Sequence, residues 1–434
     1  MVCGSVSAVL GQTGLVPKDR VEYVKVGHLF DSVAGRFRDN VVLVVEGERI
    51  RSEEGAGFAI PAGAKVVDLS GEYVLPGLID CHTHLGARAD KYDPINSFLE
   101  TPFTSAYASV NNAKRTLEAG FTTVRDVGSM PFQAVDLRNA INAGEIEGPR
   151  MVASGPILSI TGGHGDLNNY SPMVSVSMYP DHRDFSIADG PEQVQKTVRE
   201  QVKYGVDVIK ISASGGVLSK GDQPGAPQYT EAELKMAADT AHQAGRKIAA
   251  HAHGAQSIKM AIEAGIDSIE HASLVDDEGI RLAKQHGTYF VMDIYDDDYI
   301  LGNAKNFGIP EEMLVKERGV GKAQRENFRK AFKAGVKMAF GTDAGVYPHG
   351  DNGKQFHYMV MFGMTPAQAI QAATSSAADL IGRAGDVGVL APGHYADLIA
   401  VKENPLDRVE VLEHVGLVMK GGAVVKDELG GKRD

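Results

Sequence analysis

Two histidines stand one residue apart at the end of an apolar run, in the stretch GLIDCHTHLG of residues 77–86. Side chains of a β-strand alternate between its two faces, so His82 and His84 would project to the same side. Two neutral imidazoles that converge on one point indicate a metal site. The alternative is a polar pair that ends a strand or forms hydrogen bonds in a turn. The rest of the chain must distinguish the two.

Further candidate ligands follow later in the chain, again at the ends of apolar runs. The stretch AAHAHG holds His251 and His253, a second pair on one strand face. SIEHASL adds His271, and AFGTDAG adds Asp343. Nitrogen and oxygen donors without thiolates suit zinc, although the ligand types leave manganese, cobalt and iron open.

Lys210 interrupts the apolar run VDVIKISASGG, where an unpaired ammonium would be costly to bury. One interpretation places the lysine at a strand end, reaching into a pocket to hold a substrate anion. The other is chemical. A desolvated lysine loses its proton readily, and the neutral amine can add carbon dioxide to form a carbamate. A carbamate is a bidentate anion that can bridge two metal ions.

The elements that must position these side chains alternate between short apolar runs and helical patterns such as TEAELKMAADTAHQAG. Eight such strand–helix units predict an α/β fold with a closed (β/α)8 TIM barrel, whose catalytic residues lie at the C-terminal ends of the strands. Each candidate ligand ends one of the runs. The runs cover 77–84, 122–128, 150–159, 206–216, 247–254, 268–274, 289–294 and 337–345.

The two ends of the chain have a different texture, with short strands separated by turn residues. We expect residues 21–78 and 385–430 to form one small composite β-sandwich, because neither segment alone has enough strands to bury a core. The barrel would then occupy residues 79–384. Residues 1–20 would be an N-terminal tail.

Composition excludes several classes of protein. The 434 residues are 43% hydrophobic and 23% charged, which is ordinary for a globular protein, and the formal net charge is −12. Without a long basic run we expect no nucleic-acid partner, and without a long apolar run no membrane span. Cys3 and Cys81 are too few for a disulfide framework, and Cys81 is expected to be a buried thiol. The start of the chain lacks an export signal, so the cytoplasm is the default location, and an exported mature form stays open.

The order His-x-His, Lys, His, His, Asp along these runs closely resembles the amidohydrolase superfamily with a binuclear metal centre. The stretches LPGLIDCHTH before the barrel and GVLAPGHYADLIAV after it belong to the same resemblance, which covers nearly the whole chain. Within the superfamily the pattern is most similar to the branch of imidazolonepropionase-like and Xaa-Pro dipeptidase-like carboxypeptidases, which includes ochratoxinase-type enzymes.

The resemblance implies two divalent metal ions, best matched by Zn²⁺, bridged by a carbamate on Lys210. It favours His251 over His253 as a ligand, although alternation places both on one face. His253 then becomes a substrate contact, as do His164 in the glycine-rich stretch ITGGHGD and Tyr229 in GAPQYT. The implied ligand set is His82, His84 and Asp343 for the more buried ion, His251 and His271 for the more exposed ion, and Lys210 between them.

The implied reaction is hydrolysis of an amide bond next to a C-terminal amino acid, in an N-acyl amino acid, a dipeptide or an ochratoxin-type amide. A metal-bridging hydroxide would attack the carbonyl, and Asp343 would act first as base and then as acid. The alternatives are a cyclic amide or lactone hydrolase, a mononuclear deaminase, which would lack the bridging Lys210, and a metal-free scaffold, which would have lost ligands. We expect a small-molecule substrate and a homo-oligomer.

Overall fold

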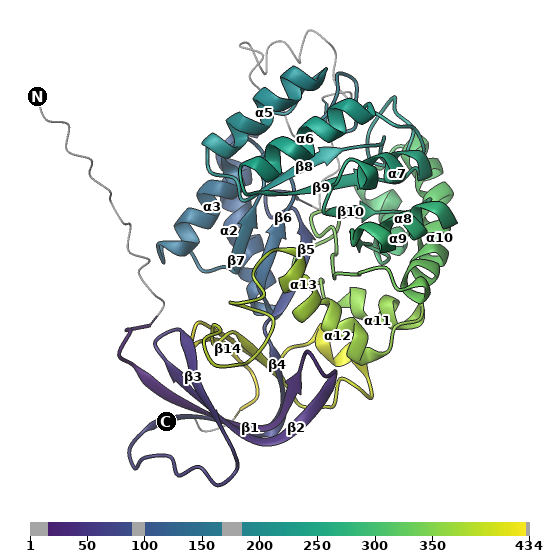
Figure 1. The fold of residues 1–434 in the computed structure, drawn as a ribbon. Coiled ribbons are helices and arrows are strands. Elements are labelled where there is room, and N and C mark those ends of the chain that lie inside the picture. The colour runs from purple at the N-terminus through teal and green to yellow at the C-terminus, as the bar shows by residue number, and fades with distance from the viewer. Residues whose placement is uncertain (1–15, 89–99, 167–184, 431–434) are drawn as a thin grey trace, which may run out of the picture.

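The computed structural model of the chain describes residues 16–88, 100–166 and 185–430. It is a mixed α/β protein in which a β-sheet lies against a larger body of alternating strands and helices (Figure 1). Most of the tail expected over residues 1–20, including Cys3, lies outside the described residues. Within the part of the chain that is described, no helix combines the length and apolarity needed to cross a membrane.

Both ends of the described chain contribute to one seven-stranded sheet, in the order β14-β13-β12-β4-β1-β2-β3. The strands expected to form a sandwich therefore hydrogen-bond as one continuous sheet. β4 lies between the two halves, parallel to β1 and antiparallel to β12. A shared core includes Val24, Leu43, Val74 and Leu398. The strands are β1 (Val21–Asp31), β2 (Arg36–Glu46), β3 (Arg49–Glu54), β4 (Lys65–Pro76), β12 (Leu398–Val401), β13 (Leu417–Lys420) and β14 (Ala423–Asp427).

Two further sheets are parallel and carry the candidate ligands. One has the order β5-β6-β7 and the other β11-β10-β9-β8. Their strands are buried on both faces, and this burial includes the polar and charged residues that stand between the apolar ones, for example in β6 (FTTVRD) and β10 (SIEH). Their members are β5 (Leu78–Thr83), β6 (Phe121–Asp126), β7 (Arg150–Ala153), β8 (Val208–Ser212), β9 (Lys247–Ala252), β10 (Ser268–His271) and β11 (Tyr289–Val291).

Isolated parallel bridges, rather than continuous ladders, connect these two sheets. Leu158 pairs with Ile211 on one side. On the other side the run 337–345 pairs with β11 through Met338 and with β5 through Ala344. This last run forms no regular strand, and near its end Asp343 lies in the left-handed region with φ 53°.

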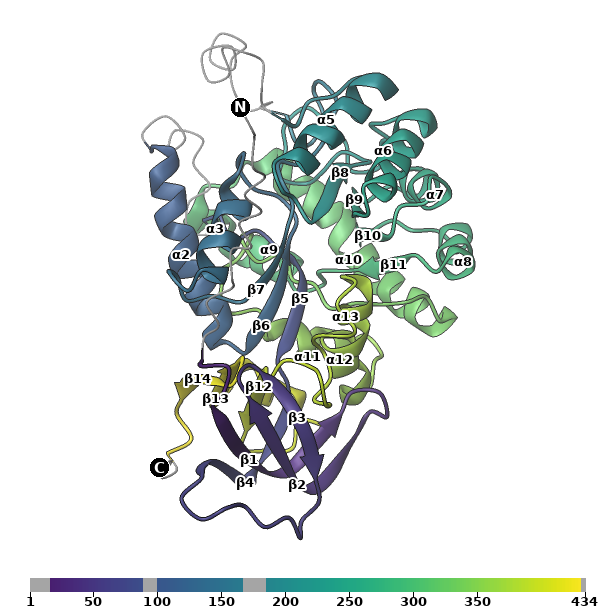
Figure 2. The ribbon, with the colours of Figure 1, turned by 60° about the vertical axis from the view of Figure 1, so that its left-hand side comes forward.

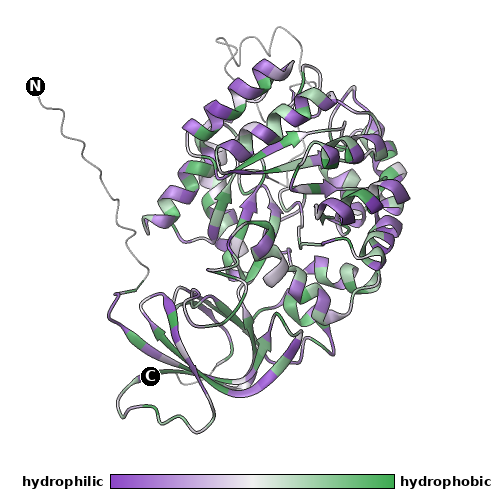
Figure 3. Ribbon diagram, viewed as in Figure 1, coloured by the Kyte–Doolittle hydropathy of each residue, from purple (hydrophilic) through white to green (hydrophobic). Residues whose placement is uncertain are grey.

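Helices cover the outer side of these strands, and α5 to α8 follow one another along β8 to β11 (Figure 2). Hydrophilic and hydrophobic residues alternate along these helices (Figure 3), and their buried residues are mainly apolar. In α6 a capping box formed by Thr230 and Glu233 fixes the first turn. The helices are α2 (Pro102–Glu118), α3 (Gln133–Asn142), α5 (Pro191–Lys203), α6 (Glu231–Gln243), α7 (Ala255–Glu263), α8 (Asp277–His286), α9 (Asp296–Phe307), α10 (Glu311–Ala334), α11 (Lys354–Met361), α12 (Pro366–Ala372), α13 (Ser375–Leu380) and the 3₁₀ helix η1 (Val409–Glu413).

Candidate metal centre

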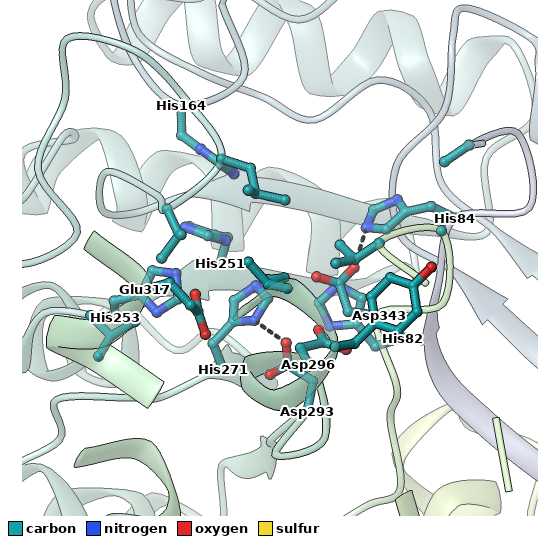
Figure 4. Close-up of a pocket in the computed structure, with 18 of the residues that line it drawn as sticks. His82, His84, His164, His251, His253, His271, Asp293, Asp296, Glu317 and Asp343 are labelled. Carbon is teal, nitrogen blue, oxygen red and sulfur yellow. Dashed lines mark hydrogen bonds and ion pairs between the residues drawn. The ribbon is translucent and has the colours of Figure 1, made fainter. Parts of the chain in front are cut away.

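A cavity of about 350 Å³ opens at the carboxyl ends of the parallel strands. Figure 4 shows its histidines and carboxylates pointing toward one another. Tyr229 does not line this cavity and is instead buried in the hydrophobic core. The other expected site residues line it, namely His82, His84, His164, Lys210, His251, His253, His271 and Asp343.

The end of β5 holds His82 and His84 beside Asp343, as strand alternation predicted. The Asp343 Oδ1 atom lies 3.1 Å from His84 Nε2 and 3.4 Å from His82 Nε2. His84 is oriented by its other nitrogen, because Nδ1 donates to the carbonyl of Gly128 at 2.9 Å. Although burial disfavours its charge, these two histidines hold the pKa of Asp343 below its usual value. Asp343 is therefore an anion at neutral pH.

His251, His253 and His271 form a second group of imidazoles across β9 and β10. Each offers a nitrogen atom, and the three atoms lie within 4.8 Å of one another. His271 Nδ1 donates to Asp293 at 2.8 Å, and His253 Nδ1 is hydrogen-bonded to Ser273 at 2.8 Å. Burial holds the pKa of both His251 and His253 well below the ordinary value, so both rings are neutral, the form that binds metals. Geometry alone does not separate His251 from His253.

Lys210 lines the same cavity and is 1% exposed, and its Nζ atom has no hydrogen-bond partner among the described residues. Burial lowers its pKa to about 8. His82 Nδ1 is likewise buried without a hydrogen bond to any described residue, with Glu270 Oε2 at 3.0 Å. Buried polar atoms are normally paired, so these two atoms fit a site that receives additional ligands. Together with neutral imidazoles they form a nitrogen and oxygen donor set suited to divalent metals.

The comparisons with known proteins agree with this geometry. The model of the amidohydrolase family matches residues 73–425. The chain belongs to this family. Ochratoxinase from Aspergillus niger is 36% identical over 368 residues, which is 81% of this chain and 75% of that protein. A solved structure of a Xaa-Pro dipeptidase with bound methionine is 37% identical in sequence, with a TM-score of 0.88. The match covers 94% of this chain and 100% of the dipeptidase chain.

The predicted resemblance to the amidohydrolases is thus confirmed, and the chain is a hydrolase that acts on amide bonds. An imidazolonepropionase from Cutibacterium acnes is also similar, at 24% identity over 83% of this chain and 84% of its own. Amidohydrolases generally use divalent metals, which agrees with the groups of histidine and aspartate described above.

Behind the ligand-type residues of this amidohydrolase lies a buried ion pair that sequence reasoning missed. Glu270 Oε2 lies 3.0 Å from His82 Nδ1, and Arg125 donates to Glu270 Oε1 at 2.8 Å. Both residues interrupt apolar strands, as Lys210 does, and the same signal could have identified them. Asp293 ends the seventh apolar run, so its position also carried a signal.

His164 is held at the cavity by the loop that follows β8. Its Nδ1 atom is hydrogen-bonded to Ser219 Oγ at 2.8 Å, and its ring stacks on His251 at 4.2 Å. A Cβ atom at position 216 would lie 2.1 Å from the His164 ring, so only glycine leaves room for it there. The loop sequence therefore fixes where this imidazole sits.

Proposed function

We propose that the chain is a binuclear metal-dependent amidohydrolase that cleaves an amide bond next to a C-terminal amino acid. The observation that carries the proposal is Lys210, a buried amine without a hydrogen-bond partner among the described residues. It lines the same cavity as five histidine and aspartate side chains of the expected ligand set. The relatives named ochratoxinase and Xaa-Pro dipeptidase support an amide with an amino-acid leaving group.

The metal assignment follows the two groups of side chains. His82, His84 and Asp343 would hold one ion, and His251 and His271 the other, with a carbamate on Lys210 between them. Two divalent cations, best matched by Zn²⁺, would lower the pKa of a water molecule and polarise the amide carbonyl.

The chain's own side chains supply proton transfer and substrate binding. The Asp343 carboxylate would accept a proton from the attacking water and return it to the leaving nitrogen, acting as base and then as acid. His164 and His253 would donate hydrogen bonds to the substrate carboxylate. Arg88 also lines the cavity, where it is ion-paired with Glu100 at 2.9 Å. Tyr229 would act on the substrate only through residues that line the cavity.

The architecture proposed with this function is a closed (β/α)8 barrel over residues 79–384. It is supported by the bridges from Leu158 to Ile211 and from the run 337–345 to both β11 and β5. The composite domain of residues 21–78 and 385–430 is supported by the pairing of β4 with β12.

The substrate test compares an N-acyl phenylalanine with its methyl ester. Charge-assisted hydrogen bonds contribute about 1.5–3 kcal/mol each, so masking the carboxylate should lower kcat/KM by at least about tenfold. The methyl ester and the free acid contain the same scissile amide. The assay measures amide cleavage as the amount of amine released. Equal rates for both would contradict the carboxypeptidase-like activity and favour a cyclic amide or lactone.

The metal test uses Lys210→Ala and elemental analysis. The wild type should contain two divalent ions per chain and show a carbamate carbon by NMR after exposure to ¹³CO₂. Lys210→Ala should lose that signal and its activity, and a short carboxylic acid should restore part of the activity by occupying the vacated space. A fully active wild type with one ion per chain would contradict the binuclear centre and favour the deaminase-like alternative.

A further inference from the structure

The helix α10 contacts the candidate site in two ways. Together with α9 it contributes to the cavity wall, through Asp296 of α9 and Glu317 of α10. Lys316, the residue before Glu317, instead contacts residues 213–222, which follow β8 and which we call the β8 loop. This contact joins two parts of the site that lie roughly one hundred residues apart in the sequence.

Lys316 uses all of its hydrogen-bond donors on this loop. Its Nζ atom donates to the carbonyls of Gly216 at 3.1 Å and Ser219 at 2.7 Å, and to Asp222 Oδ1 at 2.8 Å. An ammonium has three donors, and here each donor has an acceptor in the loop. The side chains of Lys316 and Asp222 are only 10% and 6% exposed, so water screens this ion pair weakly. Lys316 therefore fastens the β8 loop to α10.

Asp222 connects this anchor to His164 by two hydrogen-bonded routes. In the first, Ser219 Oγ is hydrogen-bonded to Asp222 at 2.7 Å and to His164 Nδ1 at 2.8 Å. In the second, the Gln228 side chain donates to Asp222 at 3.4 Å and accepts from the backbone N–H of His164 at 3.0 Å. Both the ring and the backbone of His164 are thus held from the carboxylate that Lys316 pairs.

The charge of Asp222 makes the anchor depend on Lys316. Although burial disfavours its charge, hydrogen bonds from Lys316 and Ser219 hold the pKa of Asp222 below its ordinary value. Asp222 is therefore an anion at neutral pH. Removing one partner of a buried ion pair leaves a charge that is costly to keep away from water. Without the lysine, the β8 loop should open so that water reaches Asp222.

We propose that Lys316 is a positioning residue that places His164 for binding the substrate carboxylate. The inference rests on the proposed function, in which His164 holds that carboxylate. Val217 and Leu218 line the cavity and belong to the same loop, so the anchor also fixes the wall beside His164. The ring of His164 lies against His251, and a displaced loop would move it away from the candidate metal centre (Figure 4).

The kinetic test compares Lys316→Met with the wild type on an N-acyl phenylalanine and on its methyl ester. For the free acid, KM should rise about tenfold to a hundredfold, the loss expected for one charge-assisted hydrogen bond, while kcat stays nearly unchanged. The ester lacks the carboxylate, so its KM should change little. Lys322→Met, on the exposed face of the same helix, should match the wild type. An unchanged KM for the acid, or a loss confined to kcat, would overturn the proposal.

Further variants test whether Lys316 acts through His164. In His164→Ala the carboxylate contact is already lost, so adding Lys316→Met should raise KM for the acid no further. Additive effects of the two substitutions would contradict a role through His164. Lys316→Arg keeps the charge and several donors, and its KM should lie closer to the wild-type value than that of Lys316→Met.

Limited proteolysis with trypsin measures the anchor without any turnover of substrate. Lys220 is exposed in the β8 loop, and cleavage after it follows the population of the opened loop. That cleavage should be at least about tenfold faster in Lys316→Met than in the wild type. Cleavage after Lys330, which is exposed on α10, reports general unfolding and should not change. Equal acceleration at both sites, or none after Lys220, would overturn the positioning role.

The proteolysis result also separates this inference from the proposed function. If the β8 loop opens in Lys316→Met but the wild type hydrolyses neither phenylalanine amide, or both at equal rates, the carboxypeptidase-like function fails. Calorimetric binding of N-acetyl-phenylalanine then decides the positioning role. Weaker binding to Lys316→Met than to the wild type supports it, and equal binding overturns it.

Discussion

Replacing Arg125 should destabilise the protein far more than replacing a surface arginine. Arg125 is 2% exposed and donates three hydrogen bonds. These go to the carbonyl of Cys81 at 2.5 Å, to Ser268 at 2.9 Å and to Glu270 at 2.8 Å. One side chain of β6 thereby connects β5 and β10. Arg125→Met would break all three bonds and leave Glu270 charged and buried without its cation.

The expected magnitude follows from the unpaired charge. Removing one partner of a buried ion pair costs about 3–5 kcal/mol, most of it from the charge that is left behind. A double variant, Arg125→Met with Glu270→Met, removes both charges and should be more stable than Arg125→Met alone. Arg281→Met serves as a control, because Arg281 and Glu278 form an exposed pair on α8 and should contribute nothing measurable.

The assay is urea unfolding followed by circular dichroism, with every variant in the same chelator so that metal binding does not alter the comparison. Two outcomes would refute the reasoning: Arg125→Met lowers the free energy of unfolding by less than about 1 kcal/mol, or the double variant is less stable than Arg125→Met alone. Either result would mean that the buried charge of Glu270 is compensated in another way.

Three further outcomes are expected. Asp343→Asn should keep its metal ions by elemental analysis and lose about two to four orders of magnitude in kcat, and near-normal turnover would assign the proton transfer to another group. Burial lowers the pKa of Lys420 from 10.5 to about 8, so between those values the unfolded state binds more protons and stability should rise with pH. The urea midpoint of the wild type should therefore rise relative to that of Lys420→Met from pH 8 to pH 10, and a constant difference between them would contradict that pKa. Deleting residues 385–430 removes β12 from beside β4 and should lower the thermal midpoint, whereas an equally stable, active truncation would show that the two ends fold independently.

Strand periodicity was sufficient to predict the pairing of His82 with His84, because alternation is a local property of the backbone. The same rule placed His251 and His253 on one face and does not distinguish between them, because the contacts of each ring come from residues distant in the sequence. Ser273, which holds His253, lies in a different strand–helix unit.

Other parts of the site depend on contacts that no local pattern specifies. Tyr229 follows a strand end and faces the hydrophobic core because of the path of the loop after β8. Asp296 and Glu317 come from α9 and α10, a long insertion whose position over the cavity is a matter of tertiary packing. The run 337–345 was expected to be a regular strand, and it forms only isolated bridges, with a left-handed backbone at Asp343 that the local pattern did not indicate.

The central position of β4 in the mixed sheet bears on how the chain is synthesised. Val74 and Leu75 of β4 pair with Ala400 and Ile399 of β12, which the ribosome adds roughly 320 residues later, after on the order of 16–60 s at about 5–20 residues per second. During that interval β1 to β4 can pair, but the outer edge of β4 has no neighbour. An apolar strand edge of this kind is a template for misassociation. A chaperone that covers such edges would act on this nascent chain between the emergence of β4 and that of β12.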